Sequence, residues 1–242
     1  MAASFAKFKE TFVFNFIEGA RWKYITNGLL VTLEVTFFSL LLGIAIGVVV
    51  AMIRSSYDQM KDELRPGLGS TLLKLLNEIS RLYLTVIRGT PVVVQLLIGY
   101  FVIFVSSTNT VFVASMVFGI NSGAYITEII RGGIMSIDQG QFEAGRSIGL
   151  TYIQTMRYII IPQAFKNVLP SLANEFIALL KETAVCGYIG LMDLTKGGDV
   201  IRGRTFTAYM PLLAVALIYL ILVIFFSWLV GKLERRLRSS ER

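Results

Sequence analysis

The stretch Gly89–Thr127, GTPVVVQLLIGYFVIFVSSTNTVFVASMVFGINSGAYIT, carries no charged residue over 39 consecutive positions. A helix needs about 20 apolar residues to cross the hydrocarbon core of a bilayer. The stretch therefore predicts two membrane-spanning helices, joined by the polar turn Ser106–Thr110. Residues 35–53 and 205–231 are also free of charge and predict further spans.

The composition of the whole chain points the same way. The 242 residues are 55% hydrophobic, with a mean hydropathy of +0.67, whereas soluble domains are about 45–50% apolar. We predict an all-α integral membrane protein that forms a single membrane domain over residues 1–242. Its five transmembrane helices are expected at about residues 28–53, 79–106, 111–133, 164–185 and 209–231.

The first residues predict a helix of another kind. Four phenylalanines recur at steps of three and four, which places them on one helical face. They are Phe5, Phe8, Phe12 and Phe16. We expect an interfacial helix over about residues 5–22, lying on the lipid bilayer rather than crossing it.

Lys and Arg are unevenly distributed over the two sides that five spans create. Fourteen lie on the side of the carboxyl terminus and seven on the side of the amino terminus. Because the side richer in Lys and Arg faces the cytoplasm, we expect the amino terminus outside and the carboxyl terminus in the cytoplasm. Topology then accounts for the net charge of +7, and we expect no nucleic-acid partner.

Histidine is absent and cysteine occurs once, at Cys186. The lack of histidine excludes imidazole-based catalysis, His-ligated zinc and a histidine proton relay. A single cysteine excludes a disulfide within the chain and is typical of a small packing residue. We expect no catalytic residues, no metal site and no cofactor.

Arg88-Gly89-Thr90-Pro91 interrupts the second predicted span. Glycine weakens a helix and proline suits a helix start, so we predict a broken helix here. Broken helices in membranes commonly line ligand sites, and the positive end of a restarted helix suits a carboxylate. A kink that only shapes helix packing is the alternative.

The third predicted span carries polar groups on one face. Asn121, Tyr125, Glu128 and Gly132 follow at steps of four, three and four. A carboxylate in lipid costs about 2.5–3.5 kcal/mol, so such groups usually face a partner or a water-filled cavity. A structural ion pair between Glu128 and Arg131 is the alternative to a binding role.

The fourth predicted span carries Asn174 and Glu175 after Pro170. Glu175 lies near the middle of the span, where a charge is most unfavourable. An unpaired carboxylate at that depth suits a cationic ligand group. Our hypothesis is that Glu175 receives the ammonium or guanidinium group of a substrate, with the break at Arg88–Pro91 near the substrate's carboxylate.

Residues 134–163 form the predicted cytoplasmic loop between the third and fourth spans. Within it, the segment EAGRSIGLTYIQTMRYIIIPQA opens with Glu143 and two small residues and contains Gly149 and Pro162. We predict a short helix with a small-residue face, a hinge at Gly149 and a helix restarted by Pro162. Another protein could reach this loop.

The loop resembles the cytoplasmic EAA loop of ABC-transporter permeases, in which EAA is followed by three residues, Gly, nine residues and Ile-x-Leu-Pro. The spacing is kept here, with Gly145 in place of the third Ala and Ile161 in place of Leu. Arg88–Pro91 with Gln95 is similar to the RGTP-x-x-x-Q stretch of polar amino acid permeases, and Ala124–Gly133 to their third-span signature. The resemblance extends over roughly residues 20–235.

This resemblance implies the permease fold of a type I ABC importer for polar, in particular basic, amino acids, in the bacterial cytoplasmic membrane. The implied protein partners are a cytoplasmic ABC ATPase dimer, a second permease copy and an extracytoplasmic solute-binding protein. The ATPase would bind ATP and Mg²⁺ and hydrolyse ATP, so this chain would not itself be an enzyme. The resemblance, together with the residue patterns above, assigns substrate binding to Glu175, Asn174, Glu128, Tyr125, Asn121, Arg88, Gly89, Thr90 and Gln95.

A helix around residues 141–150 would dock into a groove of the ATPase and couple ATP-driven closure to the spans. Its small residues would allow close approach, and its charges would set the register. The coupling residues are Glu143, Ala144, Gly145, Arg146, Ile148 and Gly149.

Several alternatives stay open at this stage. The substrate could be glutamine or glutamate, and the second permease could be an identical copy or a sister chain. An ion-coupled secondary transporter would use Glu128 and Glu175 as ion sites but usually shows internal repeats, which we do not find. A membrane scaffold would leave the intramembrane acids unexplained. Gly198–Thr205 nearly spells a phosphate-binding loop, but Arg204 stands where the lysine belongs and no strand precedes it.

Overall fold

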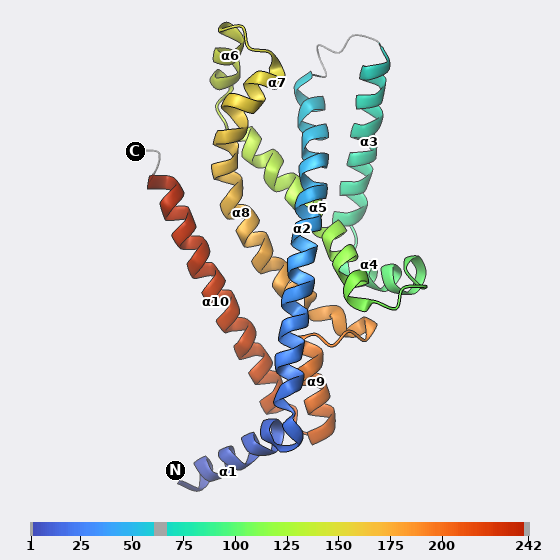
Figure 1. The fold of residues 1–242 in the computed structure, drawn as a ribbon, viewed down its shortest axis with the longest axis vertical. Helices are drawn as coiled ribbons and strands as arrows, with labels where there is room; N and C mark the ends of the chain where they lie inside the picture. The colour runs from blue at the N-terminus through green and yellow to red at the C-terminus, as the bar shows by residue number, and fades with distance from the viewer. Residues whose placement is uncertain (1, 61–66, 240–242) are drawn as a thin grey trace. The chain divides into compact units, whose positions relative to one another are not determined.

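The computed structural model describes residues 2–60 and 67–239, with side chains from residue 6 to residue 237. The described residues are helical almost throughout and include no strand (Figure 1). The prediction of an all-α protein is confirmed. The α-helices are α1 Ala2–Phe12, α2 Trp22–Met60, α3 Leu68–Arg88, α4 Val92–Ile98, α5 Thr110–Met135, α6 Gln139–Ser147, α7 Tyr152–Thr155, α8 Ile161–Glu182, α9 Leu194–Thr205 and α10 Tyr209–Ser239. Short π and 3₁₀ segments are η1 Val13–Ile17, η2 Glu18–Ala20, η3 Gly99–Ile103, η4 Met156–Ile160 and η5 Thr183–Ile189.

Three described helices are long and apolar enough to cross a membrane: α2, α5 and α10. A fourth candidate is the pair made by α3 and residues 92–103, which bends by 105° at residues 89–91. Helix α8 is 22 residues long but contains lysine, glutamate and asparagine residues, and it does not reach the same hydropathy. The predicted number of five spans therefore stays a prediction.

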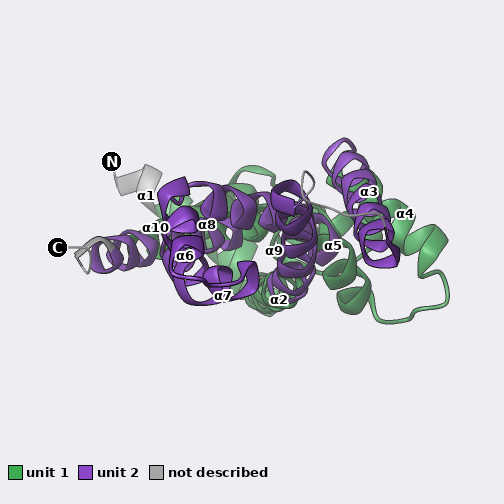
Figure 2. Cartoon of the chain, turned by 90° about the horizontal axis from the view of Figure 1, so that it is seen from above, with its two compact units in different colours: residues 1–39, 92–118, 177–228 green, residues 40–91, 119–176, 229–242 purple. Residues whose placement is uncertain are grey.

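Two compact units make up the fold, and Figure 2 colours them separately. Unit 1 contains residues 1–39, 92–118 and 177–228, and unit 2 contains residues 40–91, 119–176 and 229–242. Long helices such as α2 and α8 contribute residues to both. Each unit has its own packing and its own way of satisfying polar groups.

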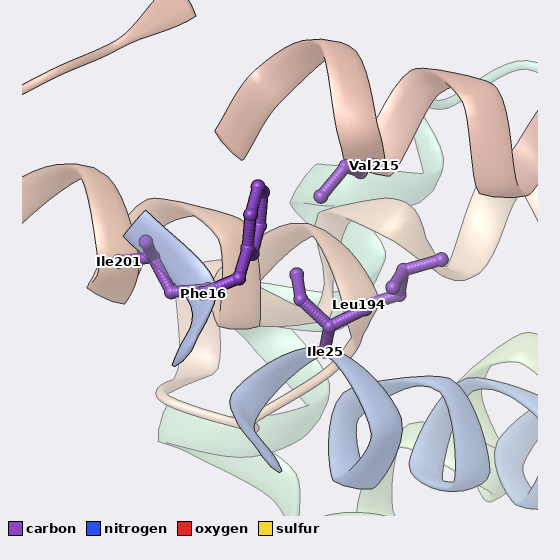
Figure 3. Close-up of a cluster of buried hydrophobic side chains, with 5 residues drawn as sticks. All are labelled: Phe16, Ile25, Leu194, Ile201 and Val215. Carbon is purple, nitrogen blue, oxygen red and sulfur yellow. The ribbon is translucent and has the colours of Figure 1, made fainter. Parts of the chain in front are cut away.

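The core of unit 1 is an apolar cluster contributed by η1, α2, α9 and α10. Its buried members are Phe16, Ile25, Leu194, Ile201 and Val215 (Figure 3). Helices α2 and α9 approach closely because glycines lie at their contact. A Cβ atom at Gly28 would lie 2.5 Å from the carbonyl oxygen of Asp193, and one at Gly197 would lie 2.4 Å from that of Tyr24.

A buried polar cluster ties the amino-terminal segment of unit 1 to the end of α9. Asn15 is fully buried, and its Oδ1 accepts hydrogen bonds from the hydroxyls of Thr205, at 3.0 Å, and Thr207. The Nδ2 of Asn15 donates to the backbone oxygen of Thr11. The side-chain amide is thus satisfied at both ends, as a buried polar group requires.

Unit 2 is organised around the contact between α2 and α5. A Cβ atom at Gly47 would lie 2.4 Å from Ile126 Cγ2, and one at Gly119 would lie 2.7 Å from Leu42 Cδ2. Small residues let membrane helices approach closely and gain van der Waals contact. Gly47 and Gly119 therefore serve the close packing of α2 against α5.

The structure corrects the predicted helix start at Pro162. A capping box of Thr151 and Gln154 starts the helix ten residues earlier, at Tyr152. The chain then stays helical through the π turn η4 into α8, and the Ile161 N–H donates to the Met156 oxygen. This change of hydrogen-bond register directly precedes Pro162, which has no N–H to donate, so the helix continues through the proline.

The expectation of one apolar phenylalanine face also needs correction. Phe8 and Phe12 are exposed but Phe16 is in the core, because the π turn η1 follows Phe12 and changes the helical register. The Phe5 side chain lies outside the described residues. Residues 198–205, which the sequence analysis rejected as a phosphate-binding loop, are part of helix α9, where Gly198 makes room for Val215.

Candidate functional site

The Glu175 carboxylate contacts α5 within unit 2. The hydroxyl of Ser122, which is fully buried, donates to Glu175 Oε1 at 2.7 Å. Glu175 itself is half-buried. Among the described side chains, no cation pairs with this carboxylate, so its one hydrogen-bond partner there is a neutral hydroxyl. The sequence analysis identified Glu175 but missed Ser122.

Asn174 and Asn121 flank this contact in the sequence but differ in environment. Asn174 is exposed, and its Nδ2 donates to the Pro170 oxygen at 3.1 Å. Asn121 is buried, only 3% exposed. Ser122 follows Asn121 on α5 and therefore lies about 100° further around the helix. Glu175 thus contacts a face of α5 that is next to the predicted polar face, not that face itself.

A chain of alternating charges connects α2, α5 and α3 in unit 2. Arg131 Nη2 lies 2.7 Å from Asp58 Oδ2, and Arg131 Nη1 lies 3.3 Å from Glu128 Oε2. The other oxygen of Glu128 lies 3.5 Å from Arg88 Nη1. The Glu128–Arg131 ion pair, considered above as an alternative, is confirmed, and Asp58 and Arg88 extend it at either end.

Tyr125 joins the Arg88 end of this chain. The guanidinium carbon of Arg88 lies 5.8 Å from the centroid of the Tyr125 ring, within the range of a cation–π interaction. Tyr125 and Glu128 therefore act on the same arginine, as their common face on α5 predicted. Because two acids and two arginines alternate in the chain, their formal charges cancel.

The break after α3 is present as predicted. Helix α3 ends at Arg88, Gly89 caps it through a 3.0 Å bond from its N–H to the Thr85 oxygen, and α4 begins at Val92. The hydroxyl of Thr90 donates to the Val86 oxygen. Gly89 and Thr90 are exposed, and Gln95 lies half-buried on α4, in unit 1.

Helix α6 carries the residues assigned to coupling. The Asp138 side chain caps its start by accepting from the Gly140 N–H. Its end is set by Gly149, which has a φ of +83°, a left-handed conformation that glycine adopts without strain. The hinge predicted at Gly149 is therefore confirmed as a helix-ending turn.

One reason given for this helix was wrong. Gly145 is buried, and a Cβ atom there would lie 2.7 Å from the side chain of Thr155. Its small size serves packing of α6 against α7 within the chain, not the approach of a partner. The exposed residues of the segment are Glu143, Ala144, Arg146, Ile148 and Gly149.

A cavity of about 330 Å³ connects α6 to the end of α2. Its lining residues include Asp58, Gln139, Arg146 and Tyr152. Asp58 is also the first member of the charge chain described above. The coupling segment and the charged residues of unit 2 thus share a common neighbour. No set of three or more acidic or cysteine side chains in the described part of the chain could hold a metal ion.

Comparison with known proteins bears on this arrangement. The family described as the inner membrane component of binding-protein-dependent transport systems matches residues 67–239. A putative glutamine transport system permease protein of Rickettsia bellii is 35% identical over 220 residues, which cover 90% of this chain and 94% of the relative. An arginine transport system permease protein of Bacillus subtilis is 34% identical over 221 residues, with coverage of 90% and 94%.

A solved transporter structure is also similar to this chain. The crystal structure of an amino acid ABC transporter with histidines aligns with a TM-score of 0.79 and 37% identity, over 91% of this chain and 98% of that chain. The chain therefore shares its overall fold with a chain of an amino acid ABC transporter.

Proposed function

This chain belongs to the family of inner membrane components of binding-protein-dependent transport systems, and from that premise we propose that it is the permease of an ATP-driven importer for polar, in particular basic, amino acids. The relatives named for arginine and glutamine transport support an amino acid substrate. In this role the chain forms the translocation path and performs no chemistry of its own.

The observation that carries the proposal is the environment of Glu175. Its carboxylate is half-buried on a helix among membrane spans, and the hydrogen-bond partner described for it is the hydroxyl of Ser122. A carboxylate in such a place is stabilised by a cation. The ammonium or guanidinium group of a basic amino acid supplies that cation during passage, while Ser122 holds the carboxylate in a fixed orientation.

Glutamine transport is a second candidate, supported by the relatives that carry that name. Every amino acid has an α-ammonium group that Glu175 could accept. The two candidates differ in which end of the substrate meets Glu175, so a single substitution separates them.

We expect Glu175→Gln to lower the kcat/KM of arginine uptake about 10–100-fold at equal amounts of transporter, because a hydrogen bond to a charged group contributes about 1.5–3 kcal/mol. Uptake is measured in proteoliposomes that contain the permease with its ATPase and binding protein. Glu34→Gln, which removes an exposed acid on α2, is the control. A selective loss of arginine over glutamine supports the basic substrate, and an equal loss supports binding of the α-ammonium group. Unchanged uptake of both would refute the role of Glu175.

Coupling to a partner ATPase is proposed for the exposed surface of α6. Glu143 and Arg146 provide charges of both signs, and Ile148 provides an apolar anchor that is 74% exposed. ATP and Mg²⁺ are bound by the ATPase in this scheme. The cavity at α6 and α2 and the charge chain from Asp58 to Arg88 form the path by which a displacement of α6 reaches the α3 break.

We expect Ile148→Asp to weaken binding of the ATPase about tenfold or more, because buried apolar anchors dominate interface energies. The measurement is the ATPase rate of the reconstituted complex with and without substrate-loaded binding protein. Ile153→Asp is the matched control, since Ile153 on α7 is also 74% exposed. Normal stimulation in the Ile148 variant would contradict the docking surface.

The remaining assembly follows the same proposal. The permease works as a pair, with an identical copy or a sister chain, and receives substrate from an extracytoplasmic solute-binding protein. Its amino terminus lies outside the bacterial cytoplasmic membrane and its carboxyl terminus inside. Labelling of a cysteine introduced at Ser147, with Cys186 replaced, tests this orientation: a membrane-impermeant reagent should reach it only in inverted vesicles.

A further inference from the structure

One face of α3 is polar along its whole length. Residues with charged or hydroxyl side chains recur at steps of four and three, which keeps them in line on a helix. They are Lys74, Glu78, Arg81, Thr85 and Arg88, and all are exposed. A second face is apolar and exposed, with Leu75, Ile79, Leu82 and Val86. The apolar face suits lipid, so the polar face suits a water-filled path.

A cavity of about 380 Å³ opens on the polar face of α3. Three arginines contribute to it, Arg54 from α2 and Arg81 and Arg88 from α3, and Glu128 from α5 also lines it. Thr85, Leu84 and Gly89 complete the lining. All of these residues lie in unit 2.

The charges around this cavity do not balance. Arg88 and Glu128 belong to the neutral chain that continues through Arg131 to Asp58. That leaves Arg54 and Arg81 as cations for which no acidic partner lies within residues 6–60 and 67–237. Two uncompensated arginines that share a cavity predict an anionic ligand.

The hydrogen bonds of these two arginines support this conclusion. Arg54 Nη1 donates to the neutral Asn77 Oδ1 at 2.7 Å, and its buried Nε has no partner within the described residues. The Arg81 guanidinium has no ion-pair or hydrogen-bond partner within residues 6–60 and 67–237. Glu78, one turn before Arg81, accepts instead from Asn77 Nδ2 at 3.3 Å.

We infer that Arg54 and Arg81 bind the α-carboxylate of the transported amino acid in this cavity, an inference that rests on the proposed function. Guanidinium groups match carboxylates through paired N–H donors. The cavity also borders Arg88 and Gly89 of the break. Within it, the carboxylate is assigned to Arg54 and Arg81 and not to Arg88, because Arg88 already pairs with Glu128.

The geometry separates this site from the Glu175 contact. Glu175 meets α5 at Ser122, whereas the cavity meets it at Glu128, six residues or about 9 Å of helix rise further along. The side-chain cation and the α-carboxylate of an extended basic amino acid can thus be recognised at different levels of α5. An anionic lipid is the less suitable ligand, because the cavity opens on the polar face of α3 and lipid suits the apolar one.

The test is equilibrium binding to the permease–ATPase complex in phosphatidylcholine nanodiscs, without ATP and without the binding protein. Radiolabelled L-arginine and L-glutamine are each competed by the unlabelled amino acid and by its α-carboxamide, which lacks the anionic end. We expect the unsubstituted complex to prefer the free acid over the amide by at least tenfold. Arg81→Gln and Arg54→Gln should each lower this preference about tenfold, mainly by weakening the binding of the free acid.

Two further variants and a measurement of phosphatidylglycerol binding serve as controls. Lys74→Gln, on the same face of α3 but outside the cavity, should keep the preference, and Arg81→Lys should retain most of it if charge is what acts. A preference unchanged in Arg81→Gln would overturn the inference. So would a loss of phosphatidylglycerol binding in that variant with the preference intact, since the cavity would then hold a lipid headgroup. If the unsubstituted complex binds neither amino acid, the proposed function itself fails.

Discussion

Units 1 and 2 are both helical, but they satisfy their polar groups in opposite ways. In unit 1 the charges of α9 pair locally: Asp199 contacts Lys196 at 3.2 Å and Arg202 within one turn of the same helix. The side chain of the buried Asn15 forms hydrogen bonds with two threonine hydroxyls and a backbone oxygen. The polar groups named here all have partners supplied by the unit itself.

In unit 2, two of the three ion pairs described above join residues that are far apart in the sequence. Asp58 and Arg131 are 73 positions apart and come from different helices. The same unit holds a half-buried acid that accepts from a neutral hydroxyl, and two arginines that form no ion pair among the side chains the structure describes. The polar groups named in unit 1 are thus paired among themselves, whereas unit 2 holds the charged groups on which the proposed ligand sites depend.

The largest effect that would sharpen this comparison concerns glycine contacts. Gly28→Ala in unit 1 places a methyl group 2.5 Å from a backbone oxygen, whereas Gly43→Ala in unit 2 meets the Ser122 side chain at 3.1 Å. Because backbone yields less than a side chain, we expect a loss of about 1–3 kcal/mol for Gly28→Ala and under about 1 kcal/mol for Gly43→Ala. Thermal unfolding in detergent measures both, with Gly231→Ala as the control, since it has open space. Equal losses of stability at Gly28 and Gly43 would contradict the expected difference between a backbone contact and a side-chain contact.

An effect of similar size is expected from removing one arginine in unit 2, and a smaller one from removing an arginine in unit 1. Arg131→Met leaves Asp58 and Glu128 facing each other without their shared cation, and Arg131 is only 16% exposed. We expect a loss of about 1–3 kcal/mol, below the range for fully buried pairs because the acids are partly solvated. Arg202→Met breaks an exposed pair and should change stability by about 0–1 kcal/mol. The same unfolding assay compares them, and an equal or reversed order would show that the inter-helix chain is not the stronger contact.

The smallest effect is a pH dependence in unit 1. Hydrogen bonds from Arg202 and then Lys196 hold the pKa of Asp199 below its ordinary value of 3.8. A lowered pKa means that the folded state favours the ionised form, so its contribution is present above the unfolded pKa and is lost as pH falls through the folded pKa. Asp199→Asn should therefore be slightly less stable than the parent at about pH 7 and equal to it at about pH 2. A difference that persists or grows in acid would contradict this assignment.

Several features of unit 2 could be predicted from the sequence because they depend on neighbours along one helix. Gly89 before Pro91 predicted the end of α3, the three-residue spacing allowed the Glu128–Arg131 pair, and Gly149 predicted the end of α6. What the pattern missed was always a contact across helices: Ser122 for Glu175, Asp58 for Arg131, and Arg54 opposite Arg81. The buried Gly145 was misinterpreted for the same reason, since its partner, Thr155, lies beyond the turn at Gly149.

The sequence by itself determined that this is a helical membrane protein, because an uncharged run of 39 residues has no other stable environment than a bilayer. It also determined where helices break and which faces are polar, since both follow from backbone chemistry and a fixed period of 3.6 residues. Only the tertiary structure decided which charges neutralise one another. Coulomb interactions depend on distances between helices, and the period of a single helix contains no information about its neighbours.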